Sequence, residues 1–139
     1  MPVLIRWYLK AALIYLVAAL GVGMVLAGQS VFNLPGFVRF LMPVYLHLFM
    51  MGWITQLIFG VVLWMFPKYS PDQPRGNENI AWLIFGLLNV GLIIRAIAEP
   101  MMSVSRVPTW AWLLAVSALL QWLAGLAFTY QAWHRVKVR

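Results

Sequence analysis

Residues 41–66 read LMPVYLHLFMMGWITQLIFGVVLWMF and contain no Asp, Glu, Lys or Arg. The hydrocarbon core of a bilayer is about 30 Å thick, and an α-helix needs about 20 mainly apolar residues to cross it. This stretch is therefore long and apolar enough to span a membrane, and it is too long for a strand. Pro43 in its first turn and Pro67 just after it suit the two ends of a helix, where the missing N–H of proline is tolerated.

Three further apolar runs of similar length cover residues 8–27, 79–98 and 109–130. We expect the third run to end before Pro100 and the fourth to begin after Pro108, with Thr109 as its N-cap. The first run is longer than the apolar part of a signal peptide, which favours a retained span. The sequence thus predicts one domain over residues 1–139, an all-α integral membrane four-helix bundle.

The composition supports this fold class and excludes others. Of the 139 residues, 64% are hydrophobic and 9% are charged, which excludes a soluble globular domain. The absence of cysteine removes disulfides, thiolate zinc sites, iron–sulfur clusters and c-type haem attachment. The net charge of +7 points to membrane topology and anionic lipid in such a chain, so we expect no nucleic-acid partner.

The cationic residues divide unequally between the two faces of the membrane. One face carries seven of the ten, namely Arg6, Lys10, Lys68, Arg75, Arg135, Lys137 and Arg139. The other face has Arg39 and Arg106, with Arg95 close to it. By the positive-inside rule, we expect both termini in the cytoplasm and the protein in the cytoplasmic (inner) membrane.

Two of the runs repeat a small, polar, small order at four-residue spacing. These residues are Gly52, Gln56 and Gly60 in the second run, and Ser117, Gln121 and Gly125 in the fourth. Helices in a bilayer associate through close contact at small residues and through interhelical hydrogen bonds. We therefore predict two packing seams, with the amides facing protein because lipid offers them no partner.

The two histidines lie at different depths. His47 falls within the outer leaflet, whereas His134 lies beyond the inner end of the fourth run, roughly 20 to 30 Å away. They cannot ligate one metal, and we interpret His134 as an interfacial residue. A histidine inside a span is by default a candidate functional residue, and this makes His47 the candidate metal ligand.

His47 shares its expected helix face with Met51, Ile54, Ile58 and Met65. One interpretation is that this apolar stripe forms a wall of a haem pocket, with Nε2 of His47 as axial ligand and Met51 beside the cofactor or as a second ligand. The other is a core histidine that donates a hydrogen bond to a carbonyl on another helix. Spacing alone leaves both interpretations open.

Three arginines lie near the depth of His47. Arg95, Arg39 and Arg106 have the charge and the geometry to bind haem propionates in bidentate pairs. In the alternative, Arg95 reaches to the outer surface or pairs with Glu99, its i+4 neighbour.

The segment from His47 to Pro67 resembles the second transmembrane helix of the catalytic subunit of haem-copper oxidases and nitric oxide reductases. The shared features are a histidine near the outer end, then Gly52-Trp53, Phe59-Gly60 in the inner half, and Pro67 at the exit. In that family the histidine is an axial ligand of the low-spin haem. The resemblance therefore implies the same role for His47.

Outside this segment the chain departs from the family. Members have further spans that carry the second haem ligand and the histidines of the oxygen or nitric oxide site, so we do not predict an enzyme active on its own. Two copies related by a two-fold axis through their second helices would each supply one His47 to a b-type haem. The alternatives are Met50 or Met51 as the second ligand, or a coordination site that stays open. The predicted function is electron transfer, or gas or redox sensing, with a redox partner or a respiratory complex as partner.

Two alternatives stay open. The first is a cofactor-free accessory or assembly subunit that packs on a larger respiratory complex through its glycine seams. The second is a quinone-binding membrane protein, in which the imidazole at membrane depth forms a hydrogen bond with a quinone carbonyl.

Overall fold

The computed structural model describes residues 1–68, 76–105 and 107–136, and helices are the only regular elements in these ranges. α1 (Val3–Gly28) is followed by a second span (Gly36–Met65), then by α4 (Glu78–Val104) and α5 (Pro108–Trp133). Each is long and apolar enough to cross a membrane. The expected all-α fold with four membrane-spanning helices is confirmed.

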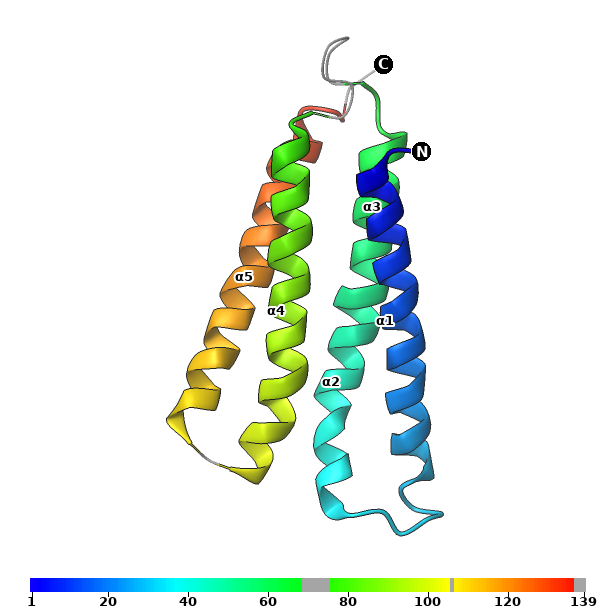
Figure 1. Cartoon of the computed structure of the whole chain (residues 1–139), viewed down its shortest axis with the longest axis vertical. Coiled ribbons are helices and arrows are strands. Elements are labelled where there is room, and N and C mark those ends of the chain that lie inside the picture. Colours follow the sequence, from blue (N-terminus) through cyan, green and yellow to red (C-terminus); the bar gives the residue numbers. More distant parts are fainter. Residues whose placement is uncertain (69–75, 106, 137–139) are drawn as a thin grey trace.

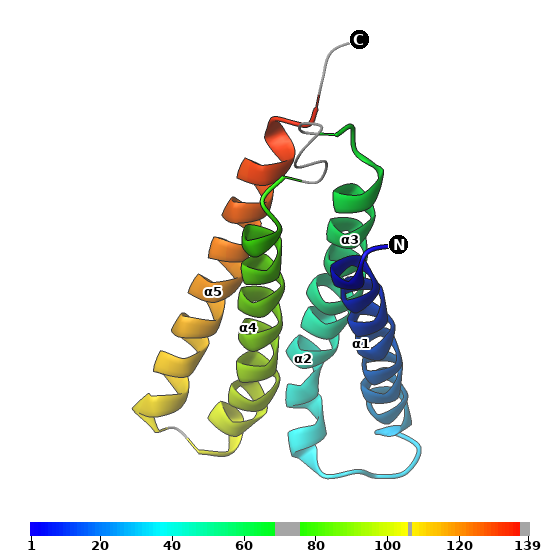
Figure 2. The same cartoon turned by 45° about the horizontal axis from the view of Figure 1, so that its top comes forward.

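The four spans form two helical hairpins that lie side by side (Figures 1 and 2). α1 packs against the second span, and α4 packs against α5. The start of α1 and the end of α5 lie at one end of the bundle, at the top of Figure 1, and the connection from α1 to the second span lies at the opposite end. The start of the first span and the end of the fourth are therefore on the same side of the bundle, as four spans require.

The second span is not a uniform α-helix. It begins with a 3-10 helix (Gly36–Leu41), continues as α2 (Met42–His47), widens into a π-helical segment (Leu48–Thr55) and ends as α3 (Gln56–Met65). The sequence predicted its extent within a few residues but not the π segment, which starts directly after His47. Such π-helical insertions are frequent at functional sites.

Two predicted helix boundaries are wrong. α4 does not end at residue 98 but continues through Pro100 to Val104. Pro100 has no N–H to donate to the Ala96 carbonyl four residues earlier, a loss that transmembrane helices tolerate. The Ser103 hydroxyl donates to the Pro100 carbonyl at 2.6 Å. α5 begins at Pro108, with Val107 at the N-cap position instead of Thr109.

The seam predicted in the second span packs against α1. A Cβ added at Gly52 would lie 2.7 Å from Cγ of Tyr15, and one at Gly60 would lie 2.9 Å from Cβ of Tyr8. Gln56 between them is fully buried, so it faces protein as expected. Neither atom of its amide group has a hydrogen-bond partner among the described residues.

The seam predicted in the fourth span joins α5 to α4. The Ser117 hydroxyl donates to the Gly91 carbonyl at 2.8 Å, and Nε2 of Gln121 donates to the Ser117 oxygen at 3.2 Å. A Cβ at Gly91 would lie 3.0 Å from Cγ of Gln121. Gly125 has open space around its Cα within the described residues, so the expectation of close packing there is wrong.

Replacing Ser117 by Ala is expected to loosen the α4–α5 hairpin. The change removes both hydrogen bonds of a buried hydroxyl, and such bonds in membrane bundles contribute about 0.5 to 2 kcal/mol. Thr129→Ala is the matched control, because the exposed Thr129 hydroxyl only donates to Gly125 of its own helix. Thermal unfolding in detergent should show a lower midpoint for Ser117→Ala alone, and equal midpoints would contradict the role of Ser117.

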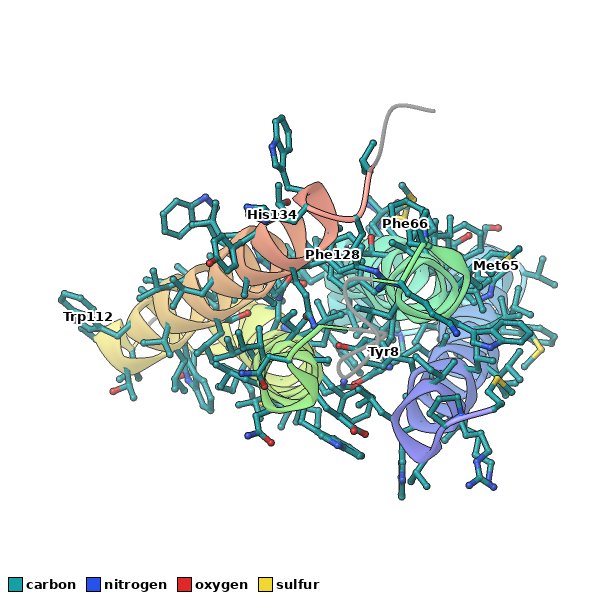
Figure 3. The ribbon with its side chains drawn as sticks, turned by 90° about the horizontal axis from the view of Figure 1, so that it is seen from above. Tyr8, Met65, Phe66, Trp112, Phe128 and His134 are labelled. Carbon is teal, nitrogen blue, oxygen red and sulfur yellow. The ribbon has the colours of Figure 1, made fainter. Side chains whose placement is uncertain are left out.

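The two hairpins are in contact along much of their length, because α4 packs against the 3-10 helix, α2 and the π-helical segment, and they are also joined near the end where α1 begins. The Tyr8 hydroxyl of α1 donates to the Ala81 carbonyl of α4 at 2.9 Å. Seen from this end, Tyr8 lies between the helices, whereas the exposed Trp112 lies at the periphery (Figure 3). Around Tyr8 is an apolar core from all four spans, including Ile5, Leu63, Ile84, Leu88 and Ala124.

A buried guanidinium adds a second connection between the hairpins. Arg135 follows the end of α5 and is 1% exposed. Its Nε, Nη1 and Nη2 donate to the carbonyls of Pro67, Leu63 and Phe66 at 3.0, 3.2 and 2.7 Å. Arg135 therefore satisfies carbonyl groups left unpaired at the C-terminal end of α3.

Candidate functional site

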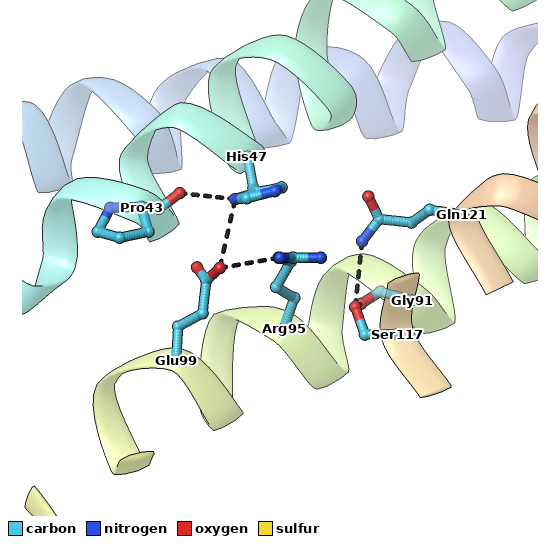
Figure 4. Close-up of polar contacts among 7 residues, drawn as sticks. All are labelled: Pro43, His47, Gly91, Arg95, Glu99, Ser117 and Gln121. Carbon is cyan, nitrogen blue, oxygen red and sulfur yellow. Dashed lines mark hydrogen bonds and ion pairs between the residues drawn. The ribbon is translucent and has the colours of Figure 1, made fainter. Parts of the chain in front are cut away.

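A cluster of three ionisable side chains lies between α2 and α4 (Figure 4). His47 is the last residue of α2, and Arg95 and Glu99 are one turn apart on α4. Nε of Arg95 donates to Oε1 of Glu99 at 2.8 Å, which confirms the pairing that the i+4 spacing offered as an alternative. Nδ1 of His47 lies 3.5 Å from the same oxygen.

The cluster depends on the continuation of α4 beyond Pro100. Had α4 ended at residue 98, Glu99 would have stood outside the helix. Because residue 99 is part of α4, the Glu99 side chain lies one turn from Arg95 on the same face of the helix and points toward α2. Its side chain is 11% exposed, and its second oxygen, Oε2, is buried without a hydrogen-bond partner in the described part of the chain.

The surroundings of His47 determine where its ring proton lies. Nδ1 is 2.8 Å from the Pro43 carbonyl, one turn earlier in the same helix. The Pro43 carbonyl and the Glu99 carboxylate accept hydrogen bonds, so Nδ1 is the ring nitrogen that donates, and in the neutral imidazole it carries the single proton. Nε2 then carries a lone pair, and it forms no hydrogen bond within the described residues. The expected alternative, a donor to a carbonyl on another helix, is wrong because Pro43 belongs to the helix of His47.

The other predicted site residues lie elsewhere. Met51 packs against the apolar core, and its sulfur accepts from the Thr55 hydroxyl at 3.7 Å. Arg39 is in the 3-10 helix and lines a cavity to which neither His47 nor Arg95 contributes. Arg106 lies outside the described residues. Of the predicted set, the structure brings together His47 and Arg95.

The sequence indicated Glu99 only as a possible partner of Arg95. The signal that could have identified it is its position, as an acidic residue within a long apolar run four residues after an arginine. The Glu99 carboxylate contacts both other members of the cluster, the Arg95 guanidinium and the His47 imidazole.

In the described ranges no group of three or more His, Cys, Asp or Glu side chains is arranged to hold a metal ion. His134 is at the opposite end of the bundle, where its Nδ1 lies 3.3 Å from the Tyr130 carbonyl. Nε2 of His47 is therefore the ring nitrogen of this cluster that stays available to a ligand in the part of the chain that the structure describes.

Fold and cluster together define the class of this protein, a four-span helical membrane protein with a histidine, carboxylate and guanidinium between its two hairpins. No family model, no curated protein and no solved structure matches the chain.

Proposed function

We propose that this integral membrane protein binds haem b through Nε2 of His47, as a relative of one segment of the oxidase catalytic subunit. The observation that supports this most directly is that two acceptors lie beside Nδ1 of His47, whereas Nε2 has no hydrogen-bond partner among the described residues. Histidine ligands of metals almost always donate their other ring N–H to a carbonyl or a carboxylate, which fixes the ring and raises its basicity. Nδ1 of His47 has the Pro43 carbonyl at 2.8 Å and the Glu99 carboxylate at 3.5 Å.

Three further features of the residues around His47 fit a bound haem. Its side chain is 29% exposed, so the ring can be reached from outside the chain. Leu46 and Met50 beside it are exposed apolar residues that can cover a porphyrin. The Nη groups of Arg95 form no hydrogen bond with the described residues, and we assign them to a propionate.

A second copy of the chain would complete the coordination. An isologous contact through the second span presents the same residue from both sides, so two His47 rings meet near the axis. When bound, haem supplies a one-electron Fe(III)/Fe(II) couple. We infer a role in electron transfer, or in gas or redox sensing, with both termini in the cytoplasm and a redox partner or respiratory complex at the membrane.

The tautomer of His47 favours haem over a quinone. A quinone carbonyl needs a hydrogen-bond donor, whereas Nε2 carries the lone pair and can only accept. An iron centre needs that lone pair. The geometry of His47 therefore supports a ligand to metal better than a donor to a quinone.

We expect the purified protein to show a Soret band that shifts on reduction, and His47→Ala to abolish it. The matched control is His134→Ala, because His134 is exposed at the far end of α5 and should leave the band unchanged. Absorption spectra of detergent-purified samples, oxidised and reduced, provide the measurement. Haem retained by His47→Ala would exclude His47 as the ligand, and a colourless wild type that co-purifies with other subunits would favour the accessory-subunit function.

A further inference from the structure

The connection between α1 and the second span encloses a polar cavity. It has a volume of about 360 Å³, and its polar lining comes from Gln29, Ser30, Asn33 and Arg39. Asn33 adopts a left-handed backbone conformation, with φ of 47°, which turns the chain around this cavity. The connection that lines the cavity lies at the lower end of the bundle in Figure 1, directly after the end of α1.

The cavity is positively charged and its polar groups are unpaired. No acidic side chain lines it. The Arg39 guanidinium forms no ion pair or hydrogen bond with any residue that the structure describes, and the same holds for the side chains of Gln29, Ser30 and Asn33. Such a set of donors around one guanidinium is suited to an oxyanion.

The segment that lines this polar cavity also carries exposed apolar side chains. Val31 and Phe32 are each 73% exposed, and Phe37 and Phe40 are about half exposed. Aromatic and aliphatic side chains exposed at the end of a span insert at the level of the lipid headgroups. The cavity therefore opens among headgroups instead of into bulk water.

An apolar groove continues from the polar cavity toward the membrane interior. It has a volume of about 510 Å³ and lies between α1 and α2, with Leu20, Gly23, Met24 and Ala27 facing Met42 and Tyr45. Leu26 lines both the groove and the polar cavity. The groove follows α1 from Leu26 to Leu20, which is about 9 Å at 1.5 Å per residue.

We propose that this cavity and groove bind one anionic glycerophospholipid. Arg39 pairs with the phosphate, the neighbouring amide and hydroxyl groups contact the headgroup, and an acyl chain lies along the groove between α1 and α2. The polar cavity and the apolar groove match the two ends of a lipid in the order in which a bilayer presents them. This site is separate from the cluster at His47, which lines neither cavity.

Native mass spectrometry of the delipidated full-length protein, titrated with phosphatidylglycerol, tests this site. We expect Arg39→Gln to weaken the tightest lipid adduct about tenfold, the effect of one charge-assisted contact. Met24→Trp, at a residue that is largely exposed, should weaken it by filling the groove without altering the core. Lys68→Gln is the control, since Lys68 is an exposed cation at the opposite end of the bundle.

Two further arms identify the source of the phosphate. Phosphatidylcholine should bind more weakly than phosphatidylglycerol, and inorganic phosphate in millimolar excess should not displace the lipid, because it cannot occupy the groove. Unchanged lipid binding by Arg39→Gln, equal binding of the two lipids, or displacement by inorganic phosphate would overturn the proposal. The Soret band is measured in the same samples, so a failure at this site is distinguished from a failure of haem binding.

Discussion

Arg135→Ala is expected to destabilise the bundle by about 2 to 4 kcal/mol, because hydrogen bonds to a charged group contribute more than neutral ones and their loss leaves buried acceptors unsatisfied. Three carbonyls at the end of α3 accept from this one side chain. The guanidinium also offsets the partial negative charge at the C-terminal end of that helix. The change therefore removes a connection between the two hairpins as well as a helix cap.

Unfolding by heat or by a denaturing detergent, followed by circular dichroism, measures this effect. Arg135→Lys should recover only part of the stability, since an ammonium cannot reproduce the planar fork that contacts three carbonyls. Arg6→Gln serves as the matched control, because Arg6 is exposed at the same end of the bundle. If Arg135→Ala unfolds at the same point as Arg6→Gln, Arg135 does not hold the hairpins together.

Gly52→Ala is expected to push α1 away from the second span and to cost about 1 to 3 kcal/mol, as overpacking of a filled contact does. The added methyl group would lie 2.7 Å from Cγ and 2.8 Å from Cβ of Tyr15. A rotamer change of Tyr15 can move its Cγ but not its Cβ, which is bonded directly to Cα, so the backbone must shift.

Gly125→Ala is the opposite case and the control. Its Cβ would meet open space within the described residues, so the substitution should stabilise α5 by about 0.5 to 1 kcal/mol through the reduced flexibility of the unfolded chain. The two single variants should therefore move the unfolding midpoint in opposite directions. A Gly52→Ala protein as stable as the wild type would show that Tyr15 does not pack closely on this position.

The sequence predicted the spans because the hydrophobic signal is local. Each run is long enough to cross a bilayer on its own composition, and the observed helices match the predicted ranges apart from their ends. The first seam was predictable for a similar reason, since Gly52 and Gly60 are small residues at helical spacing. Gly125 follows the same pattern without close packing, which shows that spacing alone does not select the partner helix.

The candidate site was predicted only in part. His47 and Arg95 stand out as ionisable residues in apolar runs, whereas Glu99 required α4 to pass through Pro100. A local rule stops a helix before proline, but α4 continues through Pro100 to Val104, as transmembrane helices tolerate. The position of the ring proton on His47 likewise depends on which acceptors lie beside Nδ1.

The sequence by itself determined how many helices the chain forms and which of them are apolar enough for a membrane, because each span satisfies its own backbone hydrogen bonds and its burial in lipid needs no partner. Only the tertiary structure decided that Glu99 lies against His47, that Arg135 caps α3, and that Arg39 lines a cavity of its own. These contacts join residues far apart in the chain or depend on an unusual helix continuation, and their energies arise only once the two hairpins are packed side by side.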